Sequence, residues 1–484
     1  PATCGHPTAK QRTAYTPDTE SGKQHTVTVT CSLCGVTIGE PVKEACSGAK
    51  GVCGKCGQQY CDHANATAGY EHIPGTLTHT TTKTCPDCGN VETQTDECVK
   101  ENGKCKFCGE DMTGVPEQDT DGYFKLTSEA ELVWFRDQIN SGATALNGRV
   151  MSNIELAEAW TPIGTDGNSF AGVFDGNQKT ISGMNVSSTT GGSCGLFASV
   201  GGTRDASAEI KDLKVTGTVT VNAPEKSGVR VGGVVAVLGA NATVSGVIAD
   251  VTVNVTCGKS SGVGGIVGQA SSETAKIERS ANLGSVTANA AYVGGIVGYG
   301  CGNVLTSYNA GAITGSGCVG GIVGEEHSSG RMPTIEDCYN IGAVKLNSET
   351  GYAGGLVGYC NRSKLFNCYN TGFVAPAKSK RVGALAGYYT SDVQGQFKTC
   401  YAVQKSVALI AELSAGDAVK NTIDARLVRT DVLRRATLDE NGLNKKDKYN
   451  VSQNGSFKIN PGKTPALIWE DVAECTHTGG TVYV

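Results

Sequence analysis

The feature that most constrains the fold is a motif that returns along the second half of the chain. Residues 293–314 read VGGIVGYGCGNVLTSYNAGAIT, and near-copies begin at Val319 and Ala353. Each copy has an aliphatic core flanked by glycines, followed by a Tyr-Asn-x-Gly turn. Such cores start at Val231, Val263, Val293, Val319, Ala353 and Val382, with a related segment at Cys194. Their spacing of 26 to 34 residues predicts a solenoid, in which each unit buries apolar surface only against its neighbours.

Units of this length that contain strand patterns and no helical periodicity predict a parallel β-helix with coils stacked about 4.8 Å apart. Equivalent residues then lie above one another, so each position must be compatible with its own copy. We expect an asparagine ladder, a tyrosine column, turn glycines with positive φ, and a column of buried cysteines. These sets are Asn282, Asn309, Asn340 and Asn370; Tyr308, Tyr339, Tyr369 and Tyr401; Gly284, Gly311, Gly342 and Gly372; and Cys338, Cys368 and Cys400. A disulfide or a metal site within the cysteine column is the alternative.

Composition agrees with this architecture and excludes several classes of protein. Glycine accounts for 66 of 484 residues and proline for only 13, without a Gly-x-y period, which excludes collagen and favours many tight turns. The formal net charge is −5 and no dense Lys/Arg cluster is present, so we expect no nucleic-acid partner. No apolar run is long enough to span a membrane. The chain opens PATCGHPTAK without a starting Met or a signal peptide, and we expect a fragment or a processed product.

The first 110 residues hold most of the cysteine and histidine, with 12 of the 21 cysteines and five of the seven histidines. They form an internal duplication with matched spacing. The first copy contains Cys4, His6, His25, Cys31, Cys34, Cys46, Cys53 and Cys56, and the second contains Cys61, His63, His79, Cys85, Cys88, Cys98, Cys105 and Cys108. Both CxxC turns of each copy are followed by glycine.

Eight such ligands in each copy equal two tetrahedral zinc sites, and a CxxC turn supplies two thiolates to one ion. We expect Cys4 and His6 to join Cys31 and Cys34, and His25 and Cys46 to join the second CxxC turn, with the same pairing in the second copy. Sequential pairing is the alternative. A disulfide framework or redox-active CxxC pairs are also open, although disulfides give no reason for histidines in register. The prediction is about four structural zinc ions.

The remaining segments are read as caps and connections. LTSEAELVWFRDQINSG predicts an amphipathic helix that begins with a capping box at Ser128 and Glu131, and residues 408–443 contain further helical stretches. Both would cover the open sheet edges of the solenoid.

Cys475-x-His477 opens a further zinc module or completes a site in a neighbouring subunit, which would allow self-association. The predicted domains are 1–58 and 59–110 (zinc modules), 111–122 (linker), 123–405 (β-helix with a helical N-terminal cap), 406–471 (C-terminal cap) and 472–484 (start of a further zinc module).

The repeats resemble a known family. The GGIVG or GGLVG core followed by CYNTG is similar to the GLUG repeats of bacterial surface proteins, which are also known from the large surface immunoglobulin-A peptidases. WTPIG, FDGN and ISGMNV resemble the segment before such repeats, and NPGKTPALIWE resembles the end of the domain. The similarity covers about residues 123–471, and Leu385 and Ala386 depart from the usual Val-Gly ending. It implies a right-handed β-helix in an exported, cell-wall-associated protein of a Gram-positive bacterium. The Cys/His head resembles, more loosely, small zinc modules of similar surface proteins.

No catalytic motif accompanies these features, and we expect no enzyme. The best polar cluster is GEEHSSGR, which places Glu325, Glu326, His327 and Arg331 on one loop, and we read it as a solvated turn with ligand binding as the alternative. The first hypothesis is a non-catalytic cell-surface or secreted scaffold or adhesin, which presents a surface to a host or cell-wall glycan or protein. The second is a carbohydrate-binding or carbohydrate-cleaving β-helix. The third, compatible with the first, is the stalk of a larger surface peptidase.

Overall fold

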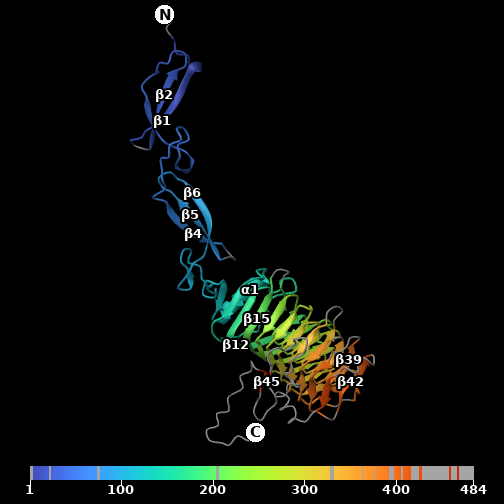
Figure 1. The fold of residues 1–484 in the computed structure, drawn as a ribbon. Coiled ribbons are helices and arrows are strands. Elements are labelled where there is room, and N and C mark those ends of the chain that lie inside the picture. The colour runs from blue at the N-terminus through green and yellow to red at the C-terminus, as the bar shows by residue number, and fades with distance from the viewer. Residues whose placement is uncertain are drawn as a thin grey trace. The chain divides into compact units, whose positions relative to one another are not determined.

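The chain divides into two compact units, Pro1–Thr113 and Gly114–Val484, and each is described by itself. The computed structural model describes residues 4–20, 23–73, 77–202, 206–327, 332–361, 363–375, 378–391, 397–404, 407–415, 424–427, 457–458 and 466–467. Figure 1 shows the elements of both units along the chain. The division falls inside the segment predicted as a linker, 111–122.

Unit 1 contains two antiparallel three-stranded sheets, one for each copy of the duplication, in the orders β1-β2-β3 and β4-β5-β6. The elements are η1 (Thr8–Lys10), β1 (Gln11–Pro17), β2 (Gln24–Cys31), β3 (Val42–Ala45), η2 (Ala49–Gly51), β4 (Thr67–His72), β5 (Thr78–Thr84), β6 (Val91–Glu97), β7 (Lys100–Glu101) and β8 (Lys104–Cys105). Most of their side chains are exposed or half-buried, and the cysteines are prominent among the few buried ones. These small sheets therefore have very little apolar core of their own.

Unit 2 begins with β9 (Tyr123–Leu126) and helix α1 (Glu129–Asn140). The predicted capping box is present, because the Ser128 side chain accepts a hydrogen bond from the backbone N–H of Glu131 at 3.4 Å. The Glu131 carboxylate in turn accepts a hydrogen bond from the backbone N–H of Thr127 at 2.7 Å. The apolar face of the helix is fully buried in the core of the unit. The prediction of a helix at this end is confirmed.

The rest of unit 2 is a parallel β-solenoid of about seven coils, and the fold prediction is confirmed. Its first coils contain β10 (Asn147–Val150), β11 (Ile154–Glu155), β12 (Val173–Ser188), β13 (Ser193–Cys194), β14 (Phe197–Val200), β15 (Ala208–Ala223), β16 (Arg230–Gly232), β17 (Val235–Leu238), β18 (Ala242–Ser245), β19 (Ile248–Cys257), β20 (Gly262–Gly264) and β21 (Val267–Ala270). The middle coils contain β22 (Lys276–Glu278), β23 (Ala281–Asn282), β24 (Val286–Ala288), β25 (Tyr292–Gly294), β26 (Val297–Gly300), β27 (Asn303–Leu305), β28 (Tyr308–Asn309), β29 (Ile313–Gly315), β30 (Cys318–Gly320) and β31 (Val323–His327). The last coils contain β32 (Thr334–Glu336), β33 (Tyr339–Asn340), β34 (Val344–Leu346), β35 (Tyr352–Gly354), β36 (Val357–Asn361), β37 (Lys364–Phe366), β38 (Tyr369–Asn370), β39 (Val382–Ser391), β40 (Phe397–Lys398), β41 (Cys400–Ala402), β42 (Ala408–Ala415) and β43 (Ala425–Leu427).

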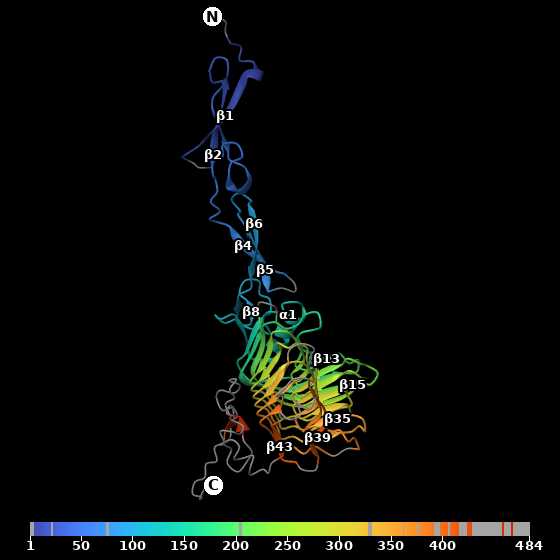
Figure 2. The ribbon, with the colours of Figure 1, turned by 45° about the vertical axis from the view of Figure 1, so that its right-hand side comes forward.

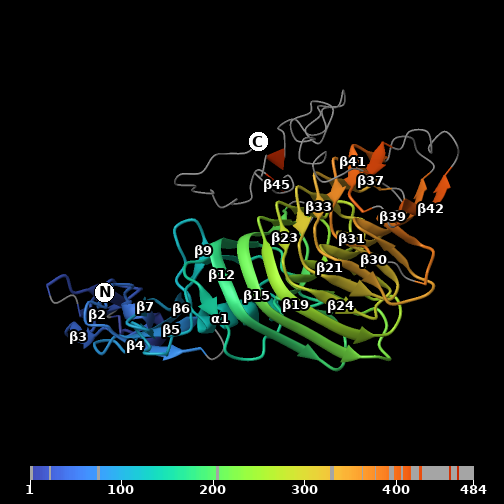
Figure 3. The same cartoon turned by 90° about the horizontal axis from the view of Figure 1, so that it is seen from below.

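Two parallel sheets run the length of the stack (Figure 3). The first sheet includes β12, β15 and β19 and continues through the short strands that precede each glycine-aliphatic core. The second sheet is built by the cores themselves, from β13 and β14 to β39 and β42. Figure 2 gives a second view in which β15 of the first sheet and β13, β35 and β39 of the second are labelled.

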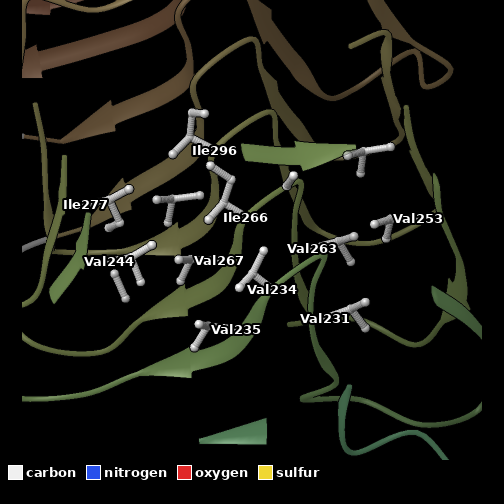
Figure 4. Packing of buried hydrophobic residues seen from close by; sticks show 14 of the residues in the cluster. Val231, Val234, Val235, Val244, Val253, Val263, Ile266, Val267, Ile277 and Ile296 are labelled. Carbon is white, nitrogen blue, oxygen red and sulfur yellow. The ribbon is translucent and has the colours of Figure 1, made fainter. Parts of the chain in front are cut away.

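The predicted start of every repeat lies in one column of the second sheet. Val231 pairs in register with Val263, then Val293, Val319, Ala353 and Val382, and Cys194 precedes them. These side chains are buried inside the coil, where Val231 and Val263 pack with Val234, Ile266 and Ile296 (Figure 4). The interior is therefore one continuous aliphatic core that passes from coil to coil.

The asparagine ladder and the tyrosine column are confirmed. The Nδ2 atom of Asn282 donates to Oδ1 of Asn309 at 2.7 Å, and the same bond recurs from Asn309 to Asn340 (2.7 Å) and from Asn340 to Asn370 (2.8 Å). All four side chains are fully buried. The rings of Tyr308, Tyr339 and Tyr369 stack with centroids 4.8 Å apart and planes within 2° of parallel, and Tyr401 continues their register. Cys338, Cys368 and Cys400 are buried with free thiols.

The explanation predicted for the turn glycines is wrong. Gly284, Gly311, Gly342 and Gly372 are all absent from the positive-φ residues of the structure. A Cβ atom on Gly311 would instead lie 1.9 Å from the carbonyl oxygen of Gly284, and one on Gly342 would lie 2.0 Å from that of Gly311. Glycine is needed here because the backbones of successive coils approach too closely for a side chain. The left-handed residues are Arg279, Thr306, Asp337, Asn367 and Thr399, which recur at another corner.

The helical prediction for the start of the C-terminal cap is also wrong. Residues Ala408–Ala415 form strand β42, which pairs in parallel with β39, and β43 pairs in parallel with β41. An exposed sheet edge offers unpaired N–H and C=O groups, and pairing with them outweighs the local helical pattern. Beyond these strands, the described parts of 406–471 are β44 (Phe457–Lys458) and β45 (Ala466–Leu467), whose Leu467 is buried with the tyrosine column. None of the described helices is long and apolar enough to cross a membrane.

Candidate metal centres

Each copy of the duplication builds two CxxC turns of the same shape. Cys31 ends β2, and the N–H of Gly35 donates to its carbonyl oxygen at 2.8 Å. Gly35 has φ of +72°, and the glycines after the other three turns, Gly57, Gly89 and Gly109, have φ between +68° and +76°. A left-handed residue at this position closes the turn, so both thiols of a CxxC pair face the same point. This is the local reason for the glycine after each pair.

The structure brings the sixteen predicted ligands together in four groups of four. In each group the donor atoms all lie within 4.8 Å of one another. The groups are Cys4, His6, Cys31 and Cys34; His25, Cys46, Cys53 and Cys56; Cys61, His63, Cys85 and Cys88; and His79, Cys98, Cys105 and Cys108. This is the alternating pairing expected from the sequence, rather than the sequential one. In each copy one group therefore links the start of the module to its middle, and the other links the middle to the end.

The distances between donor atoms fit a tetrahedral ion. Zinc–sulfur bonds of about 2.3 Å place two tetrahedral thiolates about 3.8 Å apart, and a thiolate and an imidazole nitrogen about 3.6 Å apart. Cys4 and Cys31 have their Sγ atoms 3.5 Å apart, and those of Cys46 and Cys56 are 4.0 Å apart. The Nδ1 atom of His25 lies 3.6 Å from Sγ of Cys46 and 3.4 Å from that of Cys53. The donor set therefore accommodates zinc without rearrangement.

The histidines turn the same nitrogen toward the sulfurs in all four groups. His6 and His63 place Nδ1 at 3.5 and 3.4 Å from Sγ of Cys34 and Cys88, respectively. The other nitrogen is then available for an outer partner, and Nε2 of His25 lies 3.5 Å from the Glu44 carboxylate. Nε2 of His63 lies 3.3 Å from the backbone carbonyl of Lys50. Outer partners of this kind orient metal-ligating histidines.

The thiols titrate unequally because they are crowded. A hydrogen bond from His6 helps to lower the pKa of Cys31 to about 6, and backbone N–H groups, that of Cys56 first, lower the pKa of Cys53 to about 6. Desolvation and the neighbouring thiols raise the pKa of Cys46 to about 12, and likewise that of Cys98. Three thiolates cannot ionise side by side without a compensating charge. A divalent cation supplies that charge, which agrees with the donor set.

The disulfide alternative does not match the geometry of the described cysteines. All twenty of them carry free thiols. The Sγ atoms of Cys61 and Cys85 are 3.3 Å apart, whereas a disulfide bond is about 2.05 Å long. Cys475 and His477 lie outside the described residues, so the predicted further module and its self-association stay predictions.

The second candidate site, on the GEEH loop, is divided between two faces of strand β31. Glu325 is half-buried on the outer face, and His327 is exposed. Glu326 is only 2% exposed and lies inside the coil, where its Oε2 accepts a hydrogen bond from the N–H of Asn361 at 3.2 Å. Because successive side chains of a strand alternate, Glu325 and Glu326 cannot serve one surface site. Arg331 lies outside the described residues.

Sequence reasoning missed a set of outward tyrosines around Glu325. A tyrosine stands on each side of the aliphatic core in two repeats, as Tyr292 and Tyr299 in YVGGIVGY and as Tyr352 and Tyr359 in YAGGLVGY. This pair of tyrosines around the core is the sequence signal from which the outward set could have been predicted. The following coil adds Tyr388, in register with Tyr359.

Comparison with known proteins gives only distant matches. No protein-family model matches the chain, and no curated protein matches it significantly. Among solved structures, the chain is similar to a putative immunoglobulin A1 protease from Bacteroides ovatus, with 18% identity and a TM-score of 0.38 over 50% of this chain and 85% of that one. It is also similar to a structure described as IgA1 Protease, with 14% identity and a TM-score of 0.40 over 82% of this chain and 28% of that one. The chain thus spans little more than a quarter of the second protein, and neither likeness carries an argument about function. The resemblance to GLUG repeats rests on the residues quoted above.

Proposed function

We propose that this chain is a non-catalytic module of an exported protein at a bacterial cell surface. In this proposal the β-solenoid is a rigid scaffold that presents a binding surface to a host or cell-wall partner, and the Cys/His modules are zinc-stapled spacers. The observation that supports the proposal is the register of the stack from Val231 to Val382, in which like side chains lie one above another. A role as the stalk of a larger surface peptidase is compatible with it.

The stack explains why a scaffold role suits this fold. Each coil is joined to the next by backbone pairing in both sheets, and four successive coils are also joined by the buried Asn282–Asn309–Asn340–Asn370 ladder. Opening the solenoid at any coil exposes aliphatic core and breaks both sheets together, so local opening is costly. A surface carried on such a stack keeps its shape without a partner.

The four Cys/His groups give the spacers their stability. The modules are too small and too exposed to fold on apolar burial alone. A zinc ion bound at each group would supply folding free energy and perform no chemistry, because four protein ligands leave no open position. The sixteen side chains in the four groups would hold it, and the outer contacts of His25 and His63 would fix their rings.

In the alternative function, a carbohydrate-cleaving enzyme, the candidate catalytic residue is Glu325. Desolvation raises the pKa of this carboxyl, as in many general acids. Glycoside hydrolysis normally uses a second carboxylate about 5 to 9.5 Å away. In the outer column of Glu325, the next described carboxylate is that of Glu412, three coils or about 14 Å away, and it is paired with Arg381 at 2.9 Å. A lone carboxylate favours binding over hydrolysis.

Two measurements on the whole chain test the proposal. An antibody raised against the chain is expected to label intact, unpermeabilised cells of the producing organism. Hydrogen exchange is expected to show slow exchange through β15 to β39 without any added ligand, because the scaffold is already ordered. Labelling only after the cells are permeabilised, or rapid exchange across several adjacent coils, contradicts the proposal.

A further inference from the structure

Six side chains form a continuous outward strip on the second sheet, which we call the tyrosine strip. Its members are Tyr292, Tyr299, Glu325, Tyr352, Tyr359 and Tyr388. They occupy two neighbouring columns, one through β25 and β35 and one through β26, β31, β36 and β39. All six are half-buried, whereas the residues that alternate with them, such as Val293 and Cys360, are fully buried. The strip is therefore an outer face of the scaffold.

The rings of the strip hold one another in place. Tyr292 and Tyr299 stack with centroids 4.5 Å apart, and Tyr359 and Tyr388 stack at 4.6 Å. Tyr352 meets Tyr388 edge-on at 5.4 Å. Side chains that are fixed before binding lose little conformational entropy when a ligand arrives. This is a property of aromatic recognition surfaces.

Most polar atoms of the strip have no hydrogen-bond partner within the described residues. Within the described residues, none of the five tyrosine hydroxyls donates or accepts a hydrogen bond in the structure. The Glu325 carboxylate, which stands in register between Tyr299 and Tyr359, accepts only from the Cys318 thiol at 3.3 Å. No described lysine or arginine lies within ion-pair distance of it. The strip thus offers several unused donors and acceptors next to apolar rings.

The charges around the strip balance. Arg230 lies two coils beyond Tyr292 in one column, and Arg381 follows Tyr352 at the other end, with its guanidinium 4.8 Å from the ring of Tyr352. Their two positive charges are matched by Glu325 and Glu412. From Arg230 to Glu412 the face extends over six coil steps, or about 29 Å. A neutral, elongated face is complementary to an uncharged, extended chain and not to a strongly charged one.

We propose that the tyrosine strip binds an uncharged oligosaccharide chain laid along the coil axis. Sugar rings combine an apolar C–H face, which packs on tyrosine rings, with hydroxyls that pair with phenol, carboxylate and guanidinium groups. Glu325 is the central acceptor for sugar hydroxyls, and Arg381 is a donor at one end. This inference rests on the proposed scaffold function and names the class of partner that the scaffold presents.

The test is binding of the full, zinc-loaded chain to an array of linear neutral oligosaccharides of increasing length, built from glucose, mannose, xylose, galactose or N-acetylglucosamine. Affinity for at least one series is expected to rise with length until the strip is filled, and to be insensitive to salt. Tyr359→Ala is expected to weaken that binding roughly tenfold. Tyr359→Phe, which keeps the ring and the fold, is expected to weaken it about threefold. Phe373→Ala, an exposed aromatic of the same coil outside the strip, is the matched control and leaves binding unchanged.

Several outcomes overturn the inference. The first is that no sugar series binds, and the second is that binding is unaffected by Tyr359→Ala. The third is that the chain binds oligolysine instead of sugar, and that this binding is lost when salt is added or in Glu325→Gln. In each of these the scaffold role survives, provided that the hydrogen-exchange pattern is intact. Release of shortened sugars, abolished by Tyr359→Ala, instead supports the location of the site and contradicts the non-catalytic function. The two proposals therefore fail in different ways.

Discussion

The buried carboxyl of Glu326 makes the stability of the solenoid depend on pH. Glu326 lies inside the coil between Gly300 and Cys360, and its Oε1 has no hydrogen-bond partner within the described residues. Desolvation raises the pKa of this carboxyl to about 8. The native state therefore holds a proton between pH 4.5 and 8 that the unfolded chain has released, and the free energy of unfolding falls as pH rises through this range.

The size of the effect follows from the shift. Each pKa unit corresponds to about 1.4 kcal/mol, so a shift of about 3.5 units costs on the order of 5 kcal/mol once pH exceeds the native pKa. At pH 7 the cost is about 3 kcal/mol, and below pH 4.5 it vanishes. Glu326→Gln keeps the shape and removes the charge. The variant is expected to match the wild type at pH 4.5 and to be more stable by about 3 kcal/mol at pH 7.

Urea unfolding followed by tryptophan fluorescence measures this difference, because all three tryptophans of the sequence, Trp134, Trp160 and Trp469, belong to unit 2. Comparing the variant with the wild type at each pH cancels the titration of the Cys/His groups. Glu349→Gln is the control, because that carboxylate is exposed and pairs with Lys378 at the surface. A stability difference for Glu326→Gln that stays constant from pH 4.5 to pH 8 would refute the reasoning.

Three further predictions concern other parts of the chain. Purified protein is expected to contain about four zinc ions by elemental analysis, and Cys53→Ser to contain about three; a metal-free wild type with oxidised cysteines contradicts the zinc sites. Asn309→Ala removes three buried hydrogen bonds of the ladder and is expected to lower the free energy of unfolding by roughly 3 to 5 kcal/mol, whereas a loss under 1 kcal/mol in urea titration contradicts a structural ladder. Gly321→Ala would place a Cβ atom 2.1 Å from the carbonyl oxygen of Gly355, and soluble expression is expected to fall sharply; normal yield and exchange protection argue against the tight coil contact.

Sequence alone predicted the parts of the fold in which one residue type repeats. The column from Val231 to Val382 and the asparagine ladder follow from spacing, because a solenoid places equivalent residues above one another. The duplicated Cys/His spacing predicted the ligands, but it left sequential pairing open, and only the structure selects the alternating pairing. The strand at Ala408–Ala415 could not be predicted in this way. Its local pattern also suits a helix, and only the neighbouring edge of β39 decides between the two.

The tyrosine strip shows a second limit of prediction from sequence, which concerns residues that come from different coils. Tyr292 and Tyr299 belong to one coil, and Tyr359 and Tyr388 to two others, so their proximity depends on the register of both halves of the second sheet. The second sheet has two strands in each coil, such as β25 and β26, and no periodicity in the sequence predicts how closely these two rows of strands approach each other. Similarly, the GEEH residues are adjacent in sequence, yet strand alternation sends Glu326 inside and leaves Glu325 outside.

The one-way direction of the asparagine ladder bears on how such chains can lengthen. Every amide donates toward the following coil, so the first residue, Asn282, keeps an unused Oδ1, and the last, Asn370, donates to the carbonyl of Ala384. The penalty at the Asn282 end is paid once, whatever the number of coils, while each inserted coil adds another internal amide bond. Tandem duplication of a gene segment that encodes one coil of about 30 residues therefore yields a chain that can still fold. Deletion of part of a coil instead shifts the stacked columns out of register. Natural variants are expected to differ in length by whole coils.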